Sequence, residues 1–153
     1  MDAIVSIGGG NTTVIGIPVR PVSPGILEET INGRRAAVAI RSDGLVVTPS
    51  TPARRGEVVR MYVVGVGQTS PTAQTNRVGV PDQKVLAEVA VGLDDGGIQP
   101  ISVLMAENLI GVYEVTFKIP DTAQLGERSL GLVVAPAPGQ QFFGNGSSIS
   151  IGQ

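Results

Sequence analysis

The sequence predicts an all-β protein built as a β-sandwich, and three observations carry this prediction. Apolar and polar residues alternate with a period of two in nearly every segment of the 153-residue chain. Short clusters rich in Gly, Asp, Asn and Pro separate these segments. No segment shows a sustained period of 3.6, and only residues 122–127 suggest a single helical turn.

In the first half of the chain, short strands alternate with turns. The residues expected in strands are 3–7, 13–19, 35–41, 45–47 and 57–66. Residues 8–11 (Gly-Gly-Gly-Asn) supply a hairpin turn between the first two strands, because glycine and asparagine tolerate the positive φ of tight hairpin turns. Residues 42–44 (Ser-Asp-Gly) form another turn. The run 57–66 is the longest and most continuously apolar, which predicts a central strand covered on both faces.

The second half continues the same pattern. The residues expected in strands are 84–91, 99–104, 112–119, 128–134 and 148–151. The clearest of these segments places Tyr113 and Phe117 on one face and Glu114 on the other. Such alternation is typical of a half-buried antiparallel strand. Residues 94–97 (Asp-Asp-Gly-Gly) supply a turn.

Composition narrows the classes of function. Hydrophobic residues make up 42% of the chain but aromatic residues only 3%, with no Trp, so the core must be aliphatic. The net charge of -2 argues against a nucleic-acid binder, which needs a concentrated positive face. The chain has no Cys and no His, which excludes disulfides, thiolate chemistry and a histidine base. No cofactor is predicted.

Membrane and export signals are also absent from the sequence. No apolar run approaches the roughly 20 residues that a membrane-spanning helix needs. Met1 and Asp2 precede a strand-like run with no basic segment, so no signal peptide is expected within this chain. An exported protein would then carry its signal upstream in a longer parent or have lost it.

Two segments carry a resemblance to a known family. Residues 52–67 read PARRGEVVRMYVVGVG, and residues 111–120 read GVYEVTFKIP. They resemble domains at the C-termini of large secreted proteins of Solibacter-type acidobacteria, in which "NPARPGE" and later "GLYQVNVQVP" occur. Residues 21–26, PVSPGI, resemble the family's "PAAPGIF". The chain departs from the family at Arg55, usually Pro, and at residues 140–144, which are longer and more aromatic.

The resemblance covers nearly the whole chain, and its motifs are patterns of turn and core residues, not of chemistry. It implies an immunoglobulin-like antiparallel β-sandwich at residues 27–153. Residues 1–26 would form an N-terminal hairpin and link, the tail of a preceding immunoglobulin-like half. The family is extracellular or cell-surface and has no settled activity. The resemblance therefore favours a non-enzymatic structural, adhesive or assembly module, in contact with itself or with other domains of a larger secreted protein.

An N-terminal hairpin without its parent half leaves an apolar face and open edges unless something covers them. It is expected either to fold onto the second half as extra strands or to pair with another chain by β-strand addition, in the extreme into filaments. Adjacent Phe side chains on a strand point to opposite sides, so of Phe142 and Phe143 one is expected to cap the core and the other to be a contact anchor. The predicted interface combines the two terminal hairpins, and its residues are Ile4, Val5, Ile7, Ile15, Ile17, Phe142, Phe143, Ile149 and Ile151.

The same residues allow alternative functions. A carbohydrate or surface-ligand binding module suits a β-sandwich, but sugar platforms are usually Trp or Tyr, and Tyr62 and Tyr113 are expected to be core or corner residues. Asp94 and Asp95 supply carboxylate oxygens, which are the ligands that calcium prefers. They are only weak calcium candidates, because Asp-Gly turns are common in β proteins that bind no metal. The remaining alternative, a hydrolase, would need paired carboxylates, and the candidates are Glu57, Glu107 and Glu114.

Overall fold

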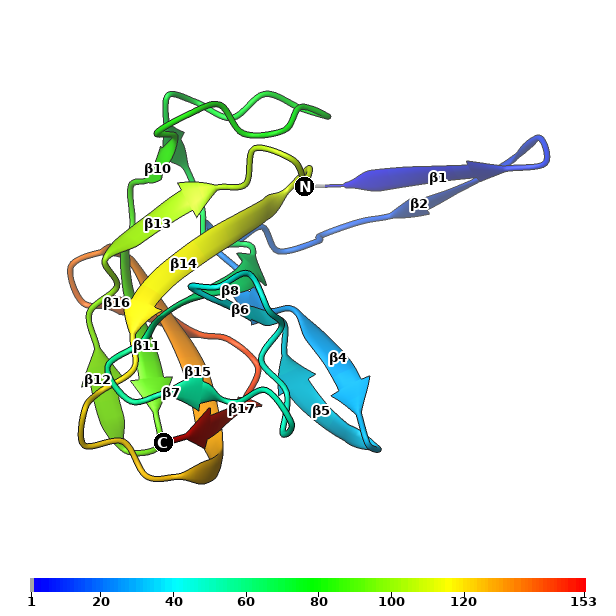
Figure 1. Cartoon of the computed structure of the whole chain (residues 1–153). Helices are drawn as coiled ribbons and strands as arrows, with labels where there is room; N and C mark the ends of the chain where they lie inside the picture. Colours follow the sequence, from blue (N-terminus) through cyan, green and yellow to red (C-terminus); the bar gives the residue numbers. More distant parts are fainter. Residues whose placement is uncertain (1) are drawn as a thin grey trace.

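The structure is a computed structural model that describes residues 2–153; Met1, the first residue of the predicted N-terminal unit, lies outside the described residues. The described residues form seventeen strands and no helix. Two large sheets pack against each other and enclose the core (Figure 1). This confirms the predicted all-β sandwich, while its immunoglobulin-like topology stays a prediction.

The first sheet has seven strands in the order β3-β8-β14-β13-β10-β9, with β6 also beside β8. Their bounds are β3 (Gly25–Ile26), β6 (Ala39–Arg41), β8 (Val58–Val64), β9 (Thr69–Ser70), β10 (Lys84–Val85), β13 (Ser102–Met105) and β14 (Val112–Lys118). The antiparallel pair β8–β14 holds the sheet together, from Val112 opposite Val64 to Lys118 opposite Val58.

The second sheet has six strands in the order β12-β11-β15-β17-β7, with β16 also beside β15. Their bounds are β7 (Ala53–Arg54), β11 (Glu88–Leu93), β12 (Gly96–Ile98), β15 (Gly126–Ala137), β16 (Gln140–Phe143) and β17 (Ser147–Gly152). The long β15 pairs with β11 along one edge and with β17 and then β16 along the other. Only the short β17–β7 pair of this sheet is parallel.

The core lies between the two sheets and is aliphatic apart from a few larger side chains. Val59 and Met61 of β8 and Phe117 of β14 are fully buried, as are Leu130 and Val134 of β15. Alternate residues of facing strands thus fill the interior, as the period of two predicts. Among the described residues, the buried hydrophobic side chains begin at Val22, so the core is complete without the N-terminal hairpin.

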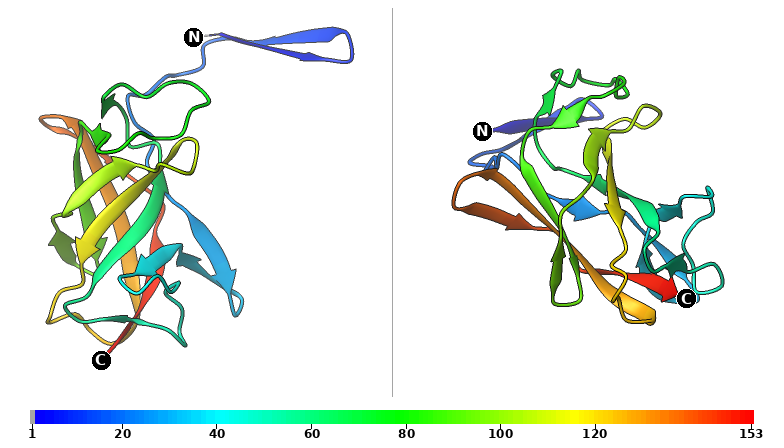
Figure 2. Two further views of the ribbon diagram at one scale, coloured as in Figure 1. Left: turned by 45° about the horizontal axis from the view of Figure 1, so that its top comes forward. Right: turned by 60° about the vertical axis from the view of Figure 1, so that its left-hand side comes forward.

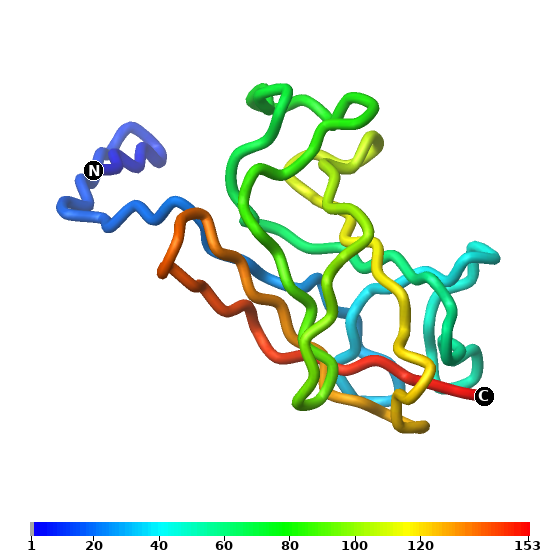
Figure 3. The backbone as a smooth tube through the Cα atoms, turned by 90° about the vertical axis from the view of Figure 1, so that its left-hand side faces the viewer, coloured from blue at the N-terminus to red at the C-terminus, as the bar shows by residue number. Residues whose placement is uncertain are grey.

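Two small hairpins lie outside the large sheets. The strands β4 (Glu28–Ile31) and β5 (Arg34–Ala37) pair with each other and flank β17. The strands β1 (Ala3–Ile7) and β2 (Gly10–Val14) form a hairpin that stands clear of the sandwich (Figures 1 and 2). This hairpin and the C-terminus lie at opposite ends of the molecule (Figure 3).

Two segments predicted as single strands divide between sheets. The run 35–41 bends at Val38, whose amide donates to the Leu27 carbonyl at 2.8 Å, so that β5 pairs with β4 whereas β6 pairs with β8. The run 84–91 divides into β10 in the first sheet and β11 in the second. Alternation of polarity continues through such a corner, so the sequence pattern does not reveal it.

Other predicted elements differ in extent. The strand expected at 13–19 ends at Val14, because Gly16 turns the chain at a φ of 71°. Residues 45–47 make only the isolated bridge of Val46 to Ile40, and residues 122–127 form no helix. The strand β8 is buried on one face only, with Arg60 exposed on the other, so the prediction of a strand covered on both faces is wrong.

Strands β4, β12 and β16 are not apparent in the sequence, because each is short and two of them are polar or Gly-rich.

The link after the N-terminal hairpin belongs to the body of the protein, which is the sandwich. Val22 and Ile26 are buried in the core, so the body begins before residue 27, the start expected from the sequence.

Candidate interaction surface

The N-terminal hairpin has regular geometry. Its register runs from Ala3 opposite Val14 to Ile7 opposite Gly10. Gly8 and Gly9 form the two-residue turn with φ values of 57° and 84°, which is the positive φ pair of a type I′ hairpin turn. The predicted hairpin turn is therefore present, although residues 10 and 11 already belong to β2.

Two side-chain hydrogen bonds close the hairpin on itself. The Ser6 hydroxyl donates to Asn11 Oδ1 at 2.7 Å, across the two strands. The Gly16 amide donates to Asp2 Oδ1 at 3.0 Å, where the hairpin joins its link. Both bonds lie within the N-terminal segment and none reaches the sandwich.

The hairpin exposes aliphatic side chains on both faces. Opposed residues of an antiparallel pair share a face, so Val5, Ile7 and Val14 lie on one side and Ile4 on the other. Ile4 is 69% exposed and Ile7 79%, and Ile15 just beyond β2 is 76% exposed. A surface of this kind is normally packed against a second layer, because one face of a sheet must be buried for stability.

We name the exposed aliphatic side chains of both hairpin faces together the hairpin surface: Ile4, Val5, Ile7, Val14 and Ile15. Val14, 46% exposed, was not among the residues predicted from the sequence, although the register places it on the same face as Val5. Ile17 is partly buried in the link and is not part of this surface.

The C-terminal half of the predicted interface is placed differently. Phe142 is partly buried and packs against the core, whereas Phe143 is 72% exposed, since neighbouring side chains of β16 point to opposite sides. Ile149 and Ile151 are only 1% and 2% exposed, because both lie on the inward row of β17. These two residues belong to the core and are not available to a partner.

Charge is distributed unevenly along the chain. Residues 3–19 and residues 129–153 contain none of the 11 Lys and Arg or 13 Asp and Glu side chains. The hairpin surface and the whole C-terminal part of the second sheet, β16 included, are therefore uncharged. Charged side chains are the usual protection of exposed strands against pairing with another chain, and these two regions lack it.

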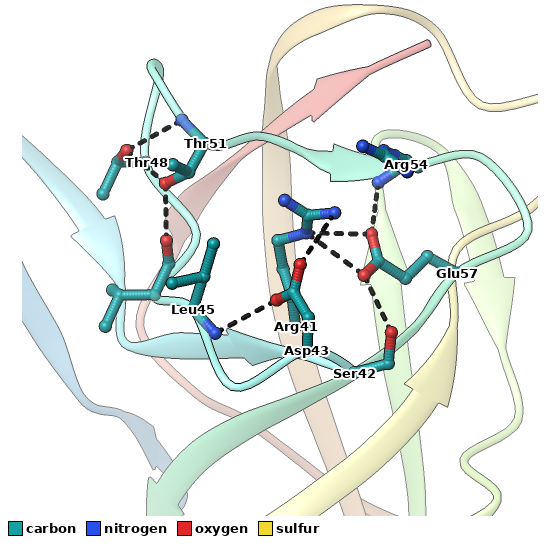
Figure 4. A network of polar contacts seen from close by, with 9 residues as sticks. Arg41, Ser42, Asp43, Leu45, Thr48, Thr51, Arg54 and Glu57 are labelled. Carbon is teal, nitrogen blue, oxygen red and sulfur yellow. Dashed lines mark hydrogen bonds and ion pairs between the residues drawn. The ribbon is translucent and has the colours of Figure 1, made fainter.

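A buried ion pair organises the turn that carries the family-like motif (Figure 4). Arg41 Nε donates to both carboxylate oxygens of Glu57 at 3.1 and 3.2 Å. The same carboxylate accepts from the Ser42 hydroxyl at 3.0 Å and from the Arg54 amide at 2.8 Å. Arg41 also lies 3.3 Å from the Asp43 carboxylate. The side chains of Arg41 and Glu57 are each 9% exposed.

The electrostatics of this cluster keep Glu57 ionised. Burial by itself raises the pKa of the Glu57 carboxyl, but the hydrogen bonds from the Arg54 amide, Ser42 and Arg41 outweigh it and hold the pKa below its ordinary value. A carboxylate with three donors in place is a structural clamp between the turn at residues 42–44 and the start of β8. It is not set up as a proton donor, which would need a raised pKa.

The rest of the motif serves the same turn. Gly56 has a φ of 76°, a conformation that favours glycine. Arg55 donates from Nε to the Ala123 carbonyl at 2.6 Å. Residues 52–57 therefore fix the entry of β8 against neighbouring loops, and their chemistry is that of a turn.

The candidate acidic residues do not converge. Arg128 Nε donates to both oxygens of Asp94, at 2.9 and 3.2 Å, and this bond lowers the pKa of the Asp94 carboxyl. Glu114 lies 3.4 Å from Arg60 on the outer face of the first sheet, and Glu107 is exposed. Within residues 2–153, no group of three or more Asp, Glu, His or Cys side chains could hold a metal ion.

One surface hollow lies between the β4–β5 hairpin and β17. Ala36, Val47, Pro49 and Ser148 contribute to its lining, and no aromatic ring of the described residues lines it.

Tyr113, a predicted core or corner residue, is buried, and its hydroxyl donates to the Gly67 carbonyl at 3.2 Å. Burial raises the pKa of this tyrosine. Neither the hollow nor Tyr113 provides a stacking platform for sugars.

Comparison of the chain with protein-family models, curated proteins and solved structures finds no match. A search of residues 2–153 for a helix with the length and apolar character needed to cross a membrane finds none.

Proposed function

We propose that this protein is a non-enzymatic structural or assembly module that self-associates by β-strand addition through the hairpin β1–β2. One observation carries the proposal: the hairpin stands clear of the sandwich and exposes the aliphatic hairpin surface to solvent (Figure 2). The resemblance of residues 52–67 and 111–120 to secreted bacterial domains supports an extracellular or cell-surface setting for this assembly.

The energetics of a free hairpin support the same conclusion. A two-stranded hairpin is marginally stable in water, and a third strand or a packed face is needed for independent stability. The sandwich does not supply that face, because the hairpin side chains remain exposed and the core begins at Val22. A strand or face from another chain would supply it. A layer on one face would cover Val5, Ile7 and Val14, and a layer on the other face would cover Ile4.

The absence of protective features points in the same direction. Strands that remain monomeric usually carry Lys, Glu or Pro, or a bulge, on their exposed edges. Residues 3–14 contain no charged side chain and no Pro, and the register of β1 and β2 is regular. The hairpin therefore presents two complete backbone edges suitable for pairing.

The test is deletion of residues 1–20, with the oligomeric state measured by light scattering over a concentration series and by electron microscopy. The intact chain is expected to form concentration-dependent oligomers, and the shortened chain is expected to be monomeric. The shortened chain should keep its cooperative thermal unfolding, because the core does not include the deleted residues. An unchanged oligomeric state after deletion would refute the proposal.

A matched pair of point variants separates the hairpin from general surface hydrophobicity. Ile7→Lys places a charge on the hairpin surface, where the side chain is 79% exposed. Ile101→Lys makes the same change at another exposed isoleucine, 62% exposed, in the sandwich. Only the first is expected to weaken association, and equal effects of both would contradict a role of the hairpin.

A further inference from the structure

Resting on the proposed function, we infer that the hairpin of one copy pairs with the outer edge of β16 (Gln140–Phe143) in a second copy. Strand addition needs an acceptor as well as a donor, and an acceptor is a strand with one unpaired, unprotected edge. The strands at the borders of the described sheets differ in whether they meet this condition.

Most border strands are blocked. The hairpin strand β4 carries Glu28 and Glu29, and charges on an edge oppose pairing. At β3 the side chain of Asn145 already bonds to both backbone groups of Ile26. Its Oδ1 accepts from the Ile26 amide at 2.7 Å, and its Nδ2 donates to the Ile26 carbonyl at 3.3 Å. The two-residue strand β9 ends at Pro71, which has no amide to donate.

The other borders are short or covered. Strand β7 has two residues, and β12 has three, of which two are Gly. The outer side of β6 is covered by residues 45–47, since the Val47 amide donates to the Ala39 carbonyl at 2.8 Å and Arg41 bonds to Leu45. A strand of two or three residues offers few ladder bonds to an incoming chain.

The edge of β16 is free of these obstacles. Its sequence is Gln-Gln-Phe-Phe, without charge or Pro, and its inner side pairs with β15 through Phe142 opposite Val134 and Phe143 opposite Val133. The bond from the Gly144 amide to the Leu132 carbonyl, 2.9 Å, extends this ladder. Among residues 2–153, no side chain or backbone group bonds to the outer edge of β16.

The direction of the backbone groups follows from this register. In an antiparallel ladder, residues whose backbone faces the partner alternate with residues whose backbone faces away. Because Gly144 bonds to β15, Phe142 does so too, and the amide and carbonyl of Phe143 face outward. The exposed ring of Phe143 stands beside these free groups and can pack on an added aliphatic strand.

Donor and acceptor are matched in length and charge. The strand β1 has five residues and β16 has four, and both lie in the uncharged parts of the chain. Val5 and Ile7 of the donor would lie beside Phe143 in the extended sheet. Their contact with the Phe143 ring would be an aromatic–aliphatic cross-strand pair, which stabilises sheets. Since no charge lies on either strand, the junction is expected to be insensitive to salt.

The arrangement in space favours a partner over self-docking. In the view of Figure 1 the hairpin projects to the right, away from β16 on the left. A donor and an acceptor on different surfaces make a head-to-tail contact, which leaves a free hairpin at one end and a free β16 edge at the other. Repetition of the contact produces a ring or an open filament.

Cysteine cross-linking tests the contact directly, because the natural chain contains no Cys. Full-length Val5→Cys and Gln141→Cys variants are mixed and treated with a short thiol cross-linker, with Val5→Cys plus Ile101→Cys as the matched control. The expected product is a cross-linked pair containing one copy of each variant in the first mixture and none in the control. Cross-linking of Val5→Cys only with itself would show association through hairpins alone, and would overturn β16 as acceptor while the proposed function stands.

A chain carrying both Val5→Cys and Gln141→Cys decides between a second copy and self-docking. Cross-links between chains support the inference, and a cross-link confined to one monomeric chain overturns it. In a separate measurement, Phe143→Lys is expected to raise the apparent dissociation constant at least about tenfold, as a lost contact anchor does. Ile101→Lys serves as its control, and an unaltered constant for Phe143→Lys would also overturn the assignment of β16.

Discussion

Replacement of Glu57 by Gln tests the reasoning about the buried ion pair. The change keeps the shape of the side chain but removes the charge that faces Arg41, and it turns an amide NH2 toward donors that now bond to the carboxylate. Breaking a buried pair costs about 3–5 kcal/mol. Arg41 keeps the Asp43 carboxylate at 3.3 Å, so we expect the lower cost of about 2–3 kcal/mol in the free energy of unfolding.

This cost converts into a measurable shift of the melting temperature. Unfolding entropy is about 2.1 cal/mol/K per residue, so for 153 residues a loss of 2–3 kcal/mol lowers Tm by about 6–9 °C. Differential scanning calorimetry at pH 7 measures it, with Glu107→Gln as the control, because Glu107 is an exposed carboxylate without a described partner. A decrease of less than about 2 °C for Glu57→Gln would refute the structural role of the pair.

The same variant has a defined pH dependence. The pKa of Glu57 is lower in the folded chain than in the unfolded chain, so its contribution is present above the ordinary carboxyl pKa of about 4.3 and is lost as pH falls through the folded pKa. The difference between wild type and Glu57→Gln should therefore shrink below about pH 4. A difference that stays constant down to pH 2 would contradict this sign.

Two further predictions concern the sandwich. Gly65→Ala should destabilise by at least about 2 kcal/mol, because Gly65 has a φ of 68° and an added Cβ would lie 2.0 Å from the Ser23 carbonyl oxygen. Gly131→Ala, in an ordinary strand conformation with nothing within 4 Å of the added carbon, should leave the urea midpoint unchanged or slightly raised. Phe117→Ala should cost about 3–5 kcal/mol in urea unfolding, because Phe117 is fully buried between the sheets. A cost below about 1 kcal/mol would contradict its place in the core.

The two uncharged regions differ in whether a second layer covers their strands. The second sheet buries its uncharged strand β17 inside the sandwich, with Ile149 and Ile151 in the core. The hairpin and β16 keep the same kind of residues at the surface. An uncharged strand contributes to stability when a second layer covers one of its faces. The described fold provides such a layer for β17 and not for the hairpin.

The amino-acid sequence by itself determined the all-β class, the aliphatic core and most strands, since these depend on local polarity and turn residues. The period of two at residues 112–119 predicts β14 within one residue at its end. The Gly-Gly turn predicts the β1–β2 hairpin. The inward direction of Phe142 and the outward direction of Phe143 also follow from strand geometry alone, without knowledge of their neighbours.

Only the tertiary structure decided which apolar strands are covered. Ile4 and Ile149 both belong to short, uncharged strands next to Gly, yet Ile4 is 69% exposed and Ile149 is 1% exposed. The same holds for the corners at residues 38 and 86–87, where strands change sheets, and for Glu57, whose partner Arg41 lies sixteen residues away. Burial and pairing of this kind depend on contacts between distant segments, which a local pattern does not contain.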